Sequence, residues 1–285
     1  VMEICNACRY CEGFCAVFPA MELHRSFEDG DLTYLANLCH DCRGCYYACQ
    51  YAPPHEFGIN LPQMLTRVRA ESYEDHAWPQ PLARLFHRNG VVVSLAAAFG
   101  LALVLILTMA QQSPEMLFAA RPAVPGSFYE VIPLNLMVVV ALVTFGFSLV
   151  ALAVGGIRFW RTAGTREKPS VEGFRQALGD ILTLRYLGGA GDGCNDLDDG
   201  FSMTRRRFHH ALAYGFLLCF AATTVGFVYN DFLGWAAPYA LFSLPVVLGT
   251  LGVAGLLIGA TGLSWIKMVA DRPPIIVAPP IGRES

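Results

Sequence analysis

The sequence predicts an all-α protein in which a helical, cysteine-rich N-terminal domain precedes a four-helix transmembrane bundle. Two cysteine runs of identical spacing lie before residue 50, and four long apolar segments follow after about residue 90. Strand patterns are weak in the first 80 residues, where apolar residues instead recur at helical spacing. Hydrophobic residues make up 54% of the 285 residues, which exceeds the content of an ordinary soluble domain.

The two cysteine runs have the ligand spacing of iron–sulfur proteins. They consist of Cys5, Cys8, Cys11 and Cys15, and of Cys39, Cys42, Cys45 and Cys49. Each reads C-x-x-C-x-x-C-x-x-x-C, the spacing of bacterial [4Fe–4S] sites, in which the fourth cysteine ligates the other cluster when two are present. We therefore expect one cluster on Cys5, Cys8, Cys11 and Cys49, and a second on Cys39, Cys42, Cys45 and Cys15.

Two other uses of cysteine fit this pattern less well. Disulfide frameworks belong mainly to small secreted domains. Structural zinc sites use pairs of C-x-x-C, whereas this chain has two quartets with the same internal spacing. The spacing therefore favours a ferredoxin-like module. Helical patterns over Asp29–Cys49, capped by Asp29 or Asp31, and over Leu61–Ser72, opened by Pro62, predict that this module is helical.

The chain divides into three expected parts. Residues 1–82 form a cytoplasmic two-cluster iron–sulfur domain, residues 83–272 a membrane domain, and residues 273–285 a proline-rich cytoplasmic tail. The expected spans cover about residues 91–110, 132–155, 208–230 and 244–266, each close to the ~20 residues that cross the hydrocarbon core as a helix. A cytoplasmic loop, residues 156–207, joins the second and third spans.

The positively charged residues predict the orientation in the membrane. Lys and Arg gather before the first span, within residues 156–207 and after the fourth span. The connection between spans one and two carries only Arg121, and the connection between spans three and four carries none. By the positive-inside rule we expect a multi-pass protein of the inner (cytoplasmic) membrane with both termini in the cytoplasm. That compartment is reducing, which suits thiolate ligands.

Three histidines are candidate haem ligands. His87 precedes the first span, and His209 and His210 open the third, so all three lie near the cytoplasmic membrane surface in the expected topology. Two imidazoles at one depth on neighbouring helices can hold a haem iron from both sides. We expect one haem b, held by His87 and by either His209 or His210. The alternative is that these histidines only face lipid headgroups.

Other residues give weaker indications. His76, Trp78 and Arg84 fall, with His87, where the cluster domain meets the membrane, and a quinone head group is expected to dock there. Cys194 follows a glycine-rich stretch and is interpreted as a plain loop thiol, with an accessory ligand as the alternative. No G-x-G-x-x-G fingerprint is present, so a partner has to bind any FAD or NAD. The net charge of −3 disfavours nucleic acid as a partner.

Several long segments resemble one known family. They are CNACRYCEGFCAVFPAME, LCHDCRGCYYACQYAPPHEFGINLPQ, RYLGGAGDGC and RRRFHHALAYGFLLCF. Together they resemble the tricarballylate (citrate) utilization protein B family over nearly the whole chain. The resemblance implies a membrane protein with two [4Fe–4S] clusters and haem. It also implies that the protein reoxidises a flavoprotein dehydrogenase and passes electrons towards the quinone pool.

The expected function is therefore membrane electron transfer. Electrons would come from a soluble FAD-dependent dehydrogenase of tricarballylate or citrate utilization, and would pass through two [4Fe–4S] clusters and a b-type haem to quinone. In this role the chain is the redox subunit of an oxidoreductase complex, and quinone reduction is its own reaction. Two alternatives stay open: a quinol-oxidising subunit that feeds a soluble reductase, and a membrane iron–sulfur redox sensor. The sequence specifies no oligomeric state and no catalytic residue.

Overall fold

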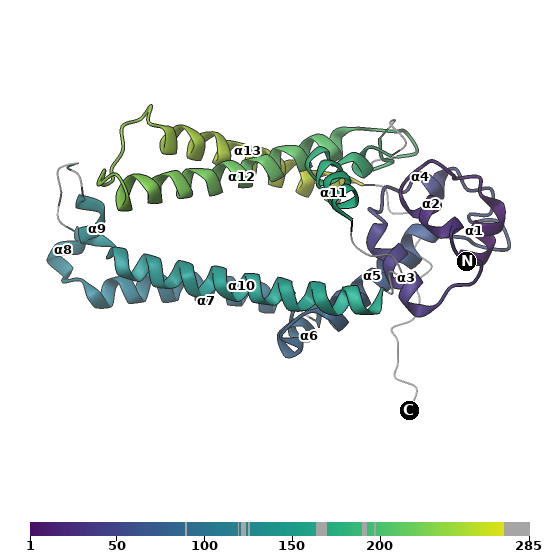
Figure 1. The fold of residues 1–285 in the computed structure, drawn as a ribbon, viewed down its shortest axis with the longest axis horizontal. Coiled ribbons are helices and arrows are strands. Elements are labelled where there is room, and N and C mark those ends of the chain that lie inside the picture. The colour runs from purple at the N-terminus through teal and green to yellow at the C-terminus, as the bar shows by residue number, and fades with distance from the viewer. Residues whose placement is uncertain are drawn as a thin grey trace.

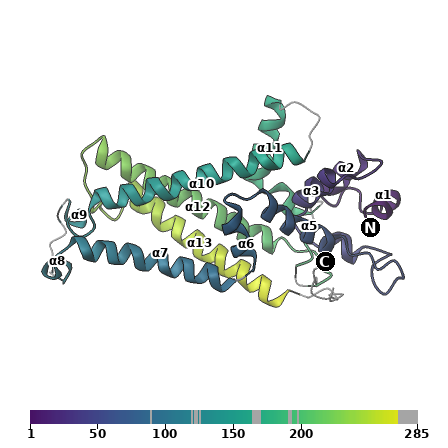
Figure 2. The same cartoon turned by 90° about the horizontal axis from the view of Figure 1, so that it is seen from below.

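The structure is a computed structural model that describes residues 1–88, 90–118, 120, 124, 126–163, 170–189, 193–196 and 198–270. Within these ranges it is helical and has no named β-strand, so the all-α prediction is confirmed. Helices α1 to α5 gather at one end of an elongated molecule, and the long helices run away from them (Figures 1 and 2). The predicted tail, residues 273–285, lies outside the described residues.

Five helices form the N-terminal domain: α1 (Met2–Cys8), α2 (Val17–Glu22), α3 (Asp29–Leu38), α4 (Gly44–Tyr47) and α5 (Leu61–His76). Its core is small. Val17, Met21, Leu35 and Leu65 are at most 1% exposed and pack in one cluster with Cys11 and Cys39. Because two cysteines of the predicted ligand sets belong to this cluster, the domain core and the cysteine sites are built together.

The single helix predicted over Asp29–Cys49 is wrong. The helix begins with a capping box, in which the Glu28 backbone N–H donates to the Asp31 carboxylate at 3.1 Å, and it ends at Leu38. Asp41 and Arg43 then take left-handed φ values of 52° and 61°, which are uncommon for non-glycine residues. A continuous helix would space the cysteines about 4.5 Å apart along its axis, since each residue rises 1.5 Å. The break instead folds the second cysteine run into a loop.

Helix α5 is longer than predicted. Asn60 caps it by accepting a hydrogen bond from the Gln63 backbone N–H at 3.1 Å, and Pro62 occupies the first turn as expected. It continues past Ser72 to His76, and this last turn reaches the membrane helices. There the Arg158 guanidinium donates to the Ala77 carbonyl oxygen at 3.2 Å.

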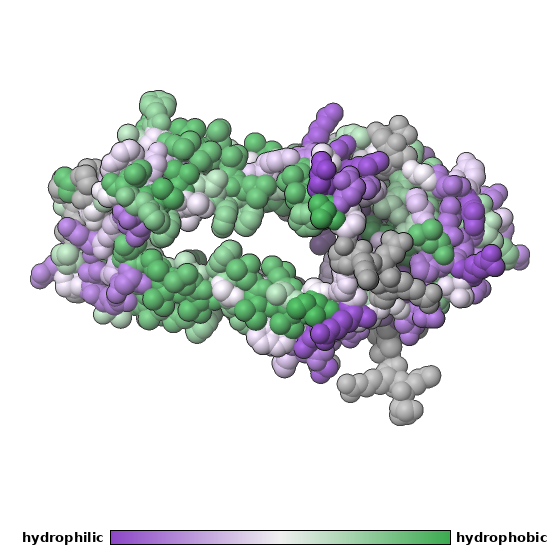
Figure 3. All heavy atoms as spheres, viewed as in Figure 1, coloured by the Kyte–Doolittle hydropathy of each residue, from purple (hydrophilic) through white to green (hydrophobic). Residues whose placement is uncertain are grey.

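Within the described residues, four helices are long and apolar enough to cross a membrane: α7 (Gly90–Gln111), α10 (Leu134–Thr162), α12 (Thr204–Asp231) and α13 (Leu244–Val269). Helix α6 (Gln80–Arg88) leads into α7, and the short α8 (Pro114–Phe118) and α9 (Ser127–Val131) lie at the end far from the cysteine-rich domain (Figure 1). Apolar residues cover the long helices, and hydrophilic residues gather at both ends (Figure 3). The protein therefore has the features of a four-span membrane protein.

Glycines bring α12 and α13 into close contact. A Cβ atom on Gly215 of α12 would lie 2.6 Å from the Leu256 backbone nitrogen, and one on Gly259 of α13 would lie 2.5 Å from that of Leu212. Small residues commonly allow such close approach between membrane helices. An opening separates this pair from α7 and α10 (Figure 3), so the bundle consists of one tight pair and a looser half.

The segment expected to be a cytoplasmic loop between the second and third spans, residues 156–207, contains helices. Helix α10 extends into it as far as Thr162, and α11 (Val171–Thr183) and the 3₁₀-helix η1 (Arg185–Gly188) follow. Val171, Phe174, Leu178 and Ile181 are exposed at helical spacing on α11. An amphipathic helix with an unburied apolar face between two spans is typical of a helix lying in the membrane surface.

We predict that Gly215→Ala destabilises the protein. The new methyl group would clash with the α13 backbone, and overpacking of this kind costs about 1–3 kcal/mol. Thermal unfolding of the detergent-solubilised protein should therefore occur at a lower temperature. The matched control is Gly146→Ala on α10, where a Cβ atom meets no heavy atom within 4 Å, and we expect no loss there. Equal unfolding temperatures for the two variants would contradict the close packing.

Candidate metal centre

The structure brings Cys5, Cys8, Cys11 and Cys49 together. Cys5 and Cys8 lie on α1, Cys11 follows a turn opened by Arg9 at φ 53°, and Cys49 comes after α4. All four line one cavity, and Cys5 and Cys11 both interact electrostatically with Cys8 and Cys49. The rest of the cavity wall is mainly apolar and includes Phe18, Ile59 and Leu61.

A second thiol group consists of Cys15, Cys39, Cys42 and Cys45, and the four cysteines above are called the first thiol group. Cys15 interacts electrostatically with Cys39 and Cys42, and Cys45 interacts with all three. The two groups adjoin each other, because Cys45 also lines the first cavity and the Cys11 sulfur lies 3.9 Å from the Cys45 carbonyl oxygen. These are the two sets that the sequence predicts as ligands. The ligation itself stays a prediction.

The chemistry of the thiols suits iron–sulfur clusters. Within the described part of the chain, no three Cys, His, Asp or Glu side chains converge closely enough to hold one metal ion. Around a single zinc ion the sulfurs would lie about 4 Å apart, because each Zn–S bond is about 2.3 Å. On a cube each thiolate binds a different iron, so the sulfurs lie farther apart. The preference for clusters over a mononuclear zinc site rests on the cysteine spacing.

Burial favours the protonated form of several of these thiols in the absence of metal. It raises the pKa of Cys5 to about 11 and those of Cys11 and Cys15 to about 12. The neighbouring cysteines add to the effect because thiolates repel one another. Iron binds the thiolate, so cluster assembly must displace several protons.

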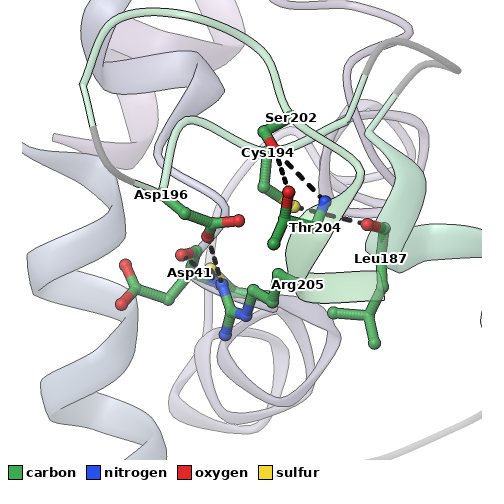
Figure 4. Close-up of polar contacts among 8 residues, drawn as sticks. Asp41, Leu187, Cys194, Asp196, Ser202, Thr204 and Arg205 are labelled. Atoms are coloured by element: carbon green, nitrogen blue, oxygen red, sulfur yellow. Dashed lines mark hydrogen bonds and ion pairs between the residues drawn. The ribbon is translucent and has the colours of Figure 1, made fainter. Parts of the chain in front are cut away.

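The sequence interpretation of Cys194 as a plain loop thiol missed its position. Cys194 is fully buried, and its thiol hydrogen-bonds the Cys42 sulfur. That bond lowers the pKa of Cys42 to about 6 and raises the pKa of Cys194. The Leu187 carbonyl oxygen, 3.3 Å from the Cys194 sulfur, is a second acceptor (Figure 4). The single thiol proton of Cys194 can be donated to only one of these two acceptors at a time.

A glycine allows the segment that carries Cys194 to lie close to neighbouring backbone. Gly193 has φ 114°, and a Cβ atom there would lie 2.3 Å from the Ser202 carbonyl oxygen. The adjacent Cys194 and Ser202 pair through two backbone hydrogen bonds of 2.9 Å. The Asn195 backbone N–H then donates to the Cys42 carbonyl oxygen at 2.9 Å. The glycine-rich stretch before Cys194 was the one sequence signal for this contact.

Arg205 ties the second cysteine run to a membrane helix. It lies in the first turn of α12 and donates to the Asp41 carbonyl oxygen at 2.9 Å. Its guanidinium also pairs with the Asp196 carboxylate at 3.5 Å (Figure 4). Burial raises the pKa of Asp196, and the Arg205 charge opposes that rise. On the other side, the Arg69 guanidinium donates to the Cys39 carbonyl oxygen. Two arginines therefore hold the loop between Cys39 and Arg43.

The histidines occupy different surroundings. The His210 ring Nε2 lies 3.1 Å from the Thr183 carbonyl oxygen, and its ring stacks on Tyr214. His209 lines a cavity of about 370 Å³ between the cysteine-rich domain and α13. The side chain of His87 lies outside the described part of the structure. His40 lies between Cys39 and Cys42 at the surface of the domain, and partial desolvation of its ring lowers its pKa.

Comparison with known proteins gives concordant matches. Residues 1–75 match the Fer4-like domain of citrate utilization protein B, and residues 84–283 match the citrate utilization protein B family. Citrate utilization protein B of Escherichia coli is 48% identical over 269 residues, which cover 94% of this chain and 70% of that protein. No solved structure matches the chain. The Fer4-like match indicates iron–sulfur binding by the N-terminal domain.

We predict that Cys49→Ala abolishes one cluster and leaves the other. The first group loses its fourth thiolate, whereas the second group keeps all of its own, so iron and sulfide per chain should fall to about half. Chemical quantification of anaerobically purified protein measures this. Cys219→Ala, in α12 outside both groups, is the control and should retain full content. Full iron content in Cys49→Ala would refute the expected ligation.

Cys194→Ala should lower the reduction potential of the second cluster without changing its iron content. Hydrogen bonds to cluster sulfurs stabilise the more negative, reduced state, and this variant removes one at Cys42. A redox titration followed by electron paramagnetic resonance measures the shift. Cys194→Ser keeps a donor and should restore part of the potential. Potentials that are the same in wild type and Cys194→Ala would contradict the proposed hydrogen bond.

Proposed function

The chain belongs to the citrate utilization protein B family, and from this premise we propose that it is the membrane electron-transfer subunit of citrate or tricarballylate utilization. In this role it accepts electrons from a soluble FAD-dependent dehydrogenase and delivers them to quinone. The observation that carries the proposal is the continuity of the two thiol groups with the membrane helices. Cys11 and Cys45 join the groups, and Arg205 joins the second group to α12.

The first thiol group is the proposed entrance for electrons. It lies in the part of the domain turned away from the long helices, where α1 is found (Figures 1 and 2). Tyr10 and Phe57, which border this region, are 66% and 51% exposed. Exposed aromatic side chains near a redox centre suit a docking surface for a soluble flavoprotein. We also propose that this domain lies in the cytoplasm, as the distribution of Lys and Arg along the chain predicts.

Haem b is part of the proposal, with His87 and either His209 or His210 as axial candidates. His209 is the better fit of the latter two, because the His210 Nε2 already lies at the Thr183 carbonyl oxygen. The cavity beside His209 has apolar residues of α13, Leu263 and Ile266, and two cations, Arg205 and Lys267. Cations at this surface would pair with haem propionates. When bound, haem supplies a one-electron relay between the second cluster and the acceptor.

Reduced flavoprotein should reduce the cofactors of the purified protein, and a quinone analogue should then reoxidise them. Anaerobic stopped-flow spectroscopy of the haem and iron–sulfur bands follows both steps. His209→Ala should lose the low-spin haem spectrum because an axial imidazole is gone, whereas His210→Ala should retain it. Haem reduction by quinol, together with no reduction by the flavoprotein, would overturn the proposed direction of electron flow.

A further inference from the structure

A cavity of about 480 Å³ lies between the cysteine-rich domain and the membrane helix α10. It is lined by the last turn of α5, by Trp78, and by α10 from Ala151 to Phe159. A second cavity, of about 410 Å³, shares Tyr73, Ala77 and Trp78 with the first and extends to Phe147. Ligand pockets of small organic molecules fall in this size range.

One end of the cavity is polar and lies next to the second thiol group. Asn37 lines it and precedes Cys39 by two residues. The Asn37 amide donates to the Ser72 hydroxyl at 3.0 Å, and that hydroxyl donates to the Arg69 carbonyl oxygen at 2.9 Å. Arg69 in turn donates to the Cys39 carbonyl oxygen, so this network connects the cavity wall to a predicted cluster ligand.

His76 presents a defined nitrogen at this end. Its Nδ1 lies 2.7 Å from the Ser72 carbonyl oxygen, and Nδ1 must be the donor because a carbonyl only accepts. The ring is fixed further by an edge contact with Phe159 at 5.7 Å between centroids. Nε2 is then an acceptor in the neutral ring and a donor in the imidazolium. It can accept from a phenolic hydroxyl and donate to a quinone carbonyl.

The other end of the cavity is apolar and adjoins the membrane. Trp78 and Phe147 contact each other with ring centroids 5.9 Å apart. Gly155 and Gly156 keep the α10 wall free of side chains, and Leu152 beside them is 73% exposed on the membrane-facing helix. An isoprenoid chain could leave the cavity along this apolar side.

We propose that this cavity is a quinone-binding site, with the ring between Trp78 and Phe159 and one carbonyl oxygen at His76. The inference rests on the proposed function for the source of electrons. The reduced flavin of the soluble dehydrogenase would supply two electrons, one at a time, through the redox centres proposed for this chain, and two protons would come from the cytoplasm, the first through His76. The two C=O groups of the ring become C–OH groups, and the reduced flavin of the soluble dehydrogenase is oxidised.

A bound phospholipid is the other occupant that an apolar cavity in this position can take. A quinone accounts better for the aromatic walls, which suit a flat ring. It also accounts for a polar network confined to the end nearest the second thiol group. Arg84 is directed elsewhere, since it pairs with Glu74 at 3.9 Å, and is not part of the site.

Gly156→Leu tests the site. A Cβ atom at Gly156 meets no heavy atom within 4 Å, so the larger side chain can fill the cavity without a backbone clash. Gly100→Leu on α7 is the matched control, with equally open space and no part in the cavity. We expect Gly156→Leu to raise the KM for a short-chain quinone analogue at least tenfold and to leave cofactor reduction by the flavoprotein unchanged. Gly100→Leu should match wild type.

Photolabelling with an azidoquinone locates binding independently of turnover. Label on peptides of α5 and α10, competed by quinone and lost in Gly156→Leu, would support the site. Label confined to α12 and α13, or equal competition by phospholipid, would overturn it. His76→Gln keeps a hydrogen-bond donor but no proton relay, so it should lower kcat more than it changes KM.

The two proposals fail in different ways. If wild type and Gly156→Leu reduce the quinone analogue equally well, the site is wrong while electron transfer to quinone stands. If the label maps to the cavity but flavoprotein-reduced protein never reduces quinone, the proposed direction of electron flow is wrong while the binding site stands.

Discussion

The loop between Cys39 and Arg43 is the constraint on which the arrangement of this protein depends. It carries two predicted ligands, and its left-handed residues Asp41 and Arg43 leave its carbonyl oxygens without helical partners. Those oxygens are bonded from outside: Cys39 by Arg69, Asp41 by Arg205 and Cys42 by the Asn195 backbone. The donors come from the cysteine-rich domain, a membrane helix and the segment between two spans. One loop therefore orients three parts of the chain.

The N-terminal domain also rests directly on α10. Gly30 of α3 approaches Thr162 so closely that a Cβ atom there would lie 2.6 Å from its carbonyl oxygen. Helix α10 has 29 residues and is about 43 Å long, which exceeds the ~30 Å hydrocarbon core. The helix therefore extends beyond the hydrocarbon core, and its last turns form a platform for the domain. This geometry brings a redox centre close to the membrane surface without placing it in lipid.

Much of the fold follows from local patterns in the sequence. Cysteine spacing specifies which thiols can share a cluster, and apolar runs of about 20 residues specify membrane helices. The break at Cys39 was not predicted, because helical periodicity continues through it and the tertiary contacts of the loop override it. Cys194 could not be assigned either, since its partner Cys42 lies in another domain. The cavity at His76 depends on the packing of α5 against α10, which no local pattern encodes.

The contact between Cys194 and Cys42 has a consequence for biosynthesis. The second thiol group is made early, but Cys194, Asn195 and Arg205 emerge only after two membrane helices have been synthesised. At 5–20 residues per second, the roughly 150 residues between Cys45 and Cys194 take on the order of ten to thirty seconds to translate. During that interval the nascent second group lacks its covering segment. The second group is therefore enclosed only after two membrane helices have followed it, whereas all four cysteines of the first group are present once Cys49 has been made.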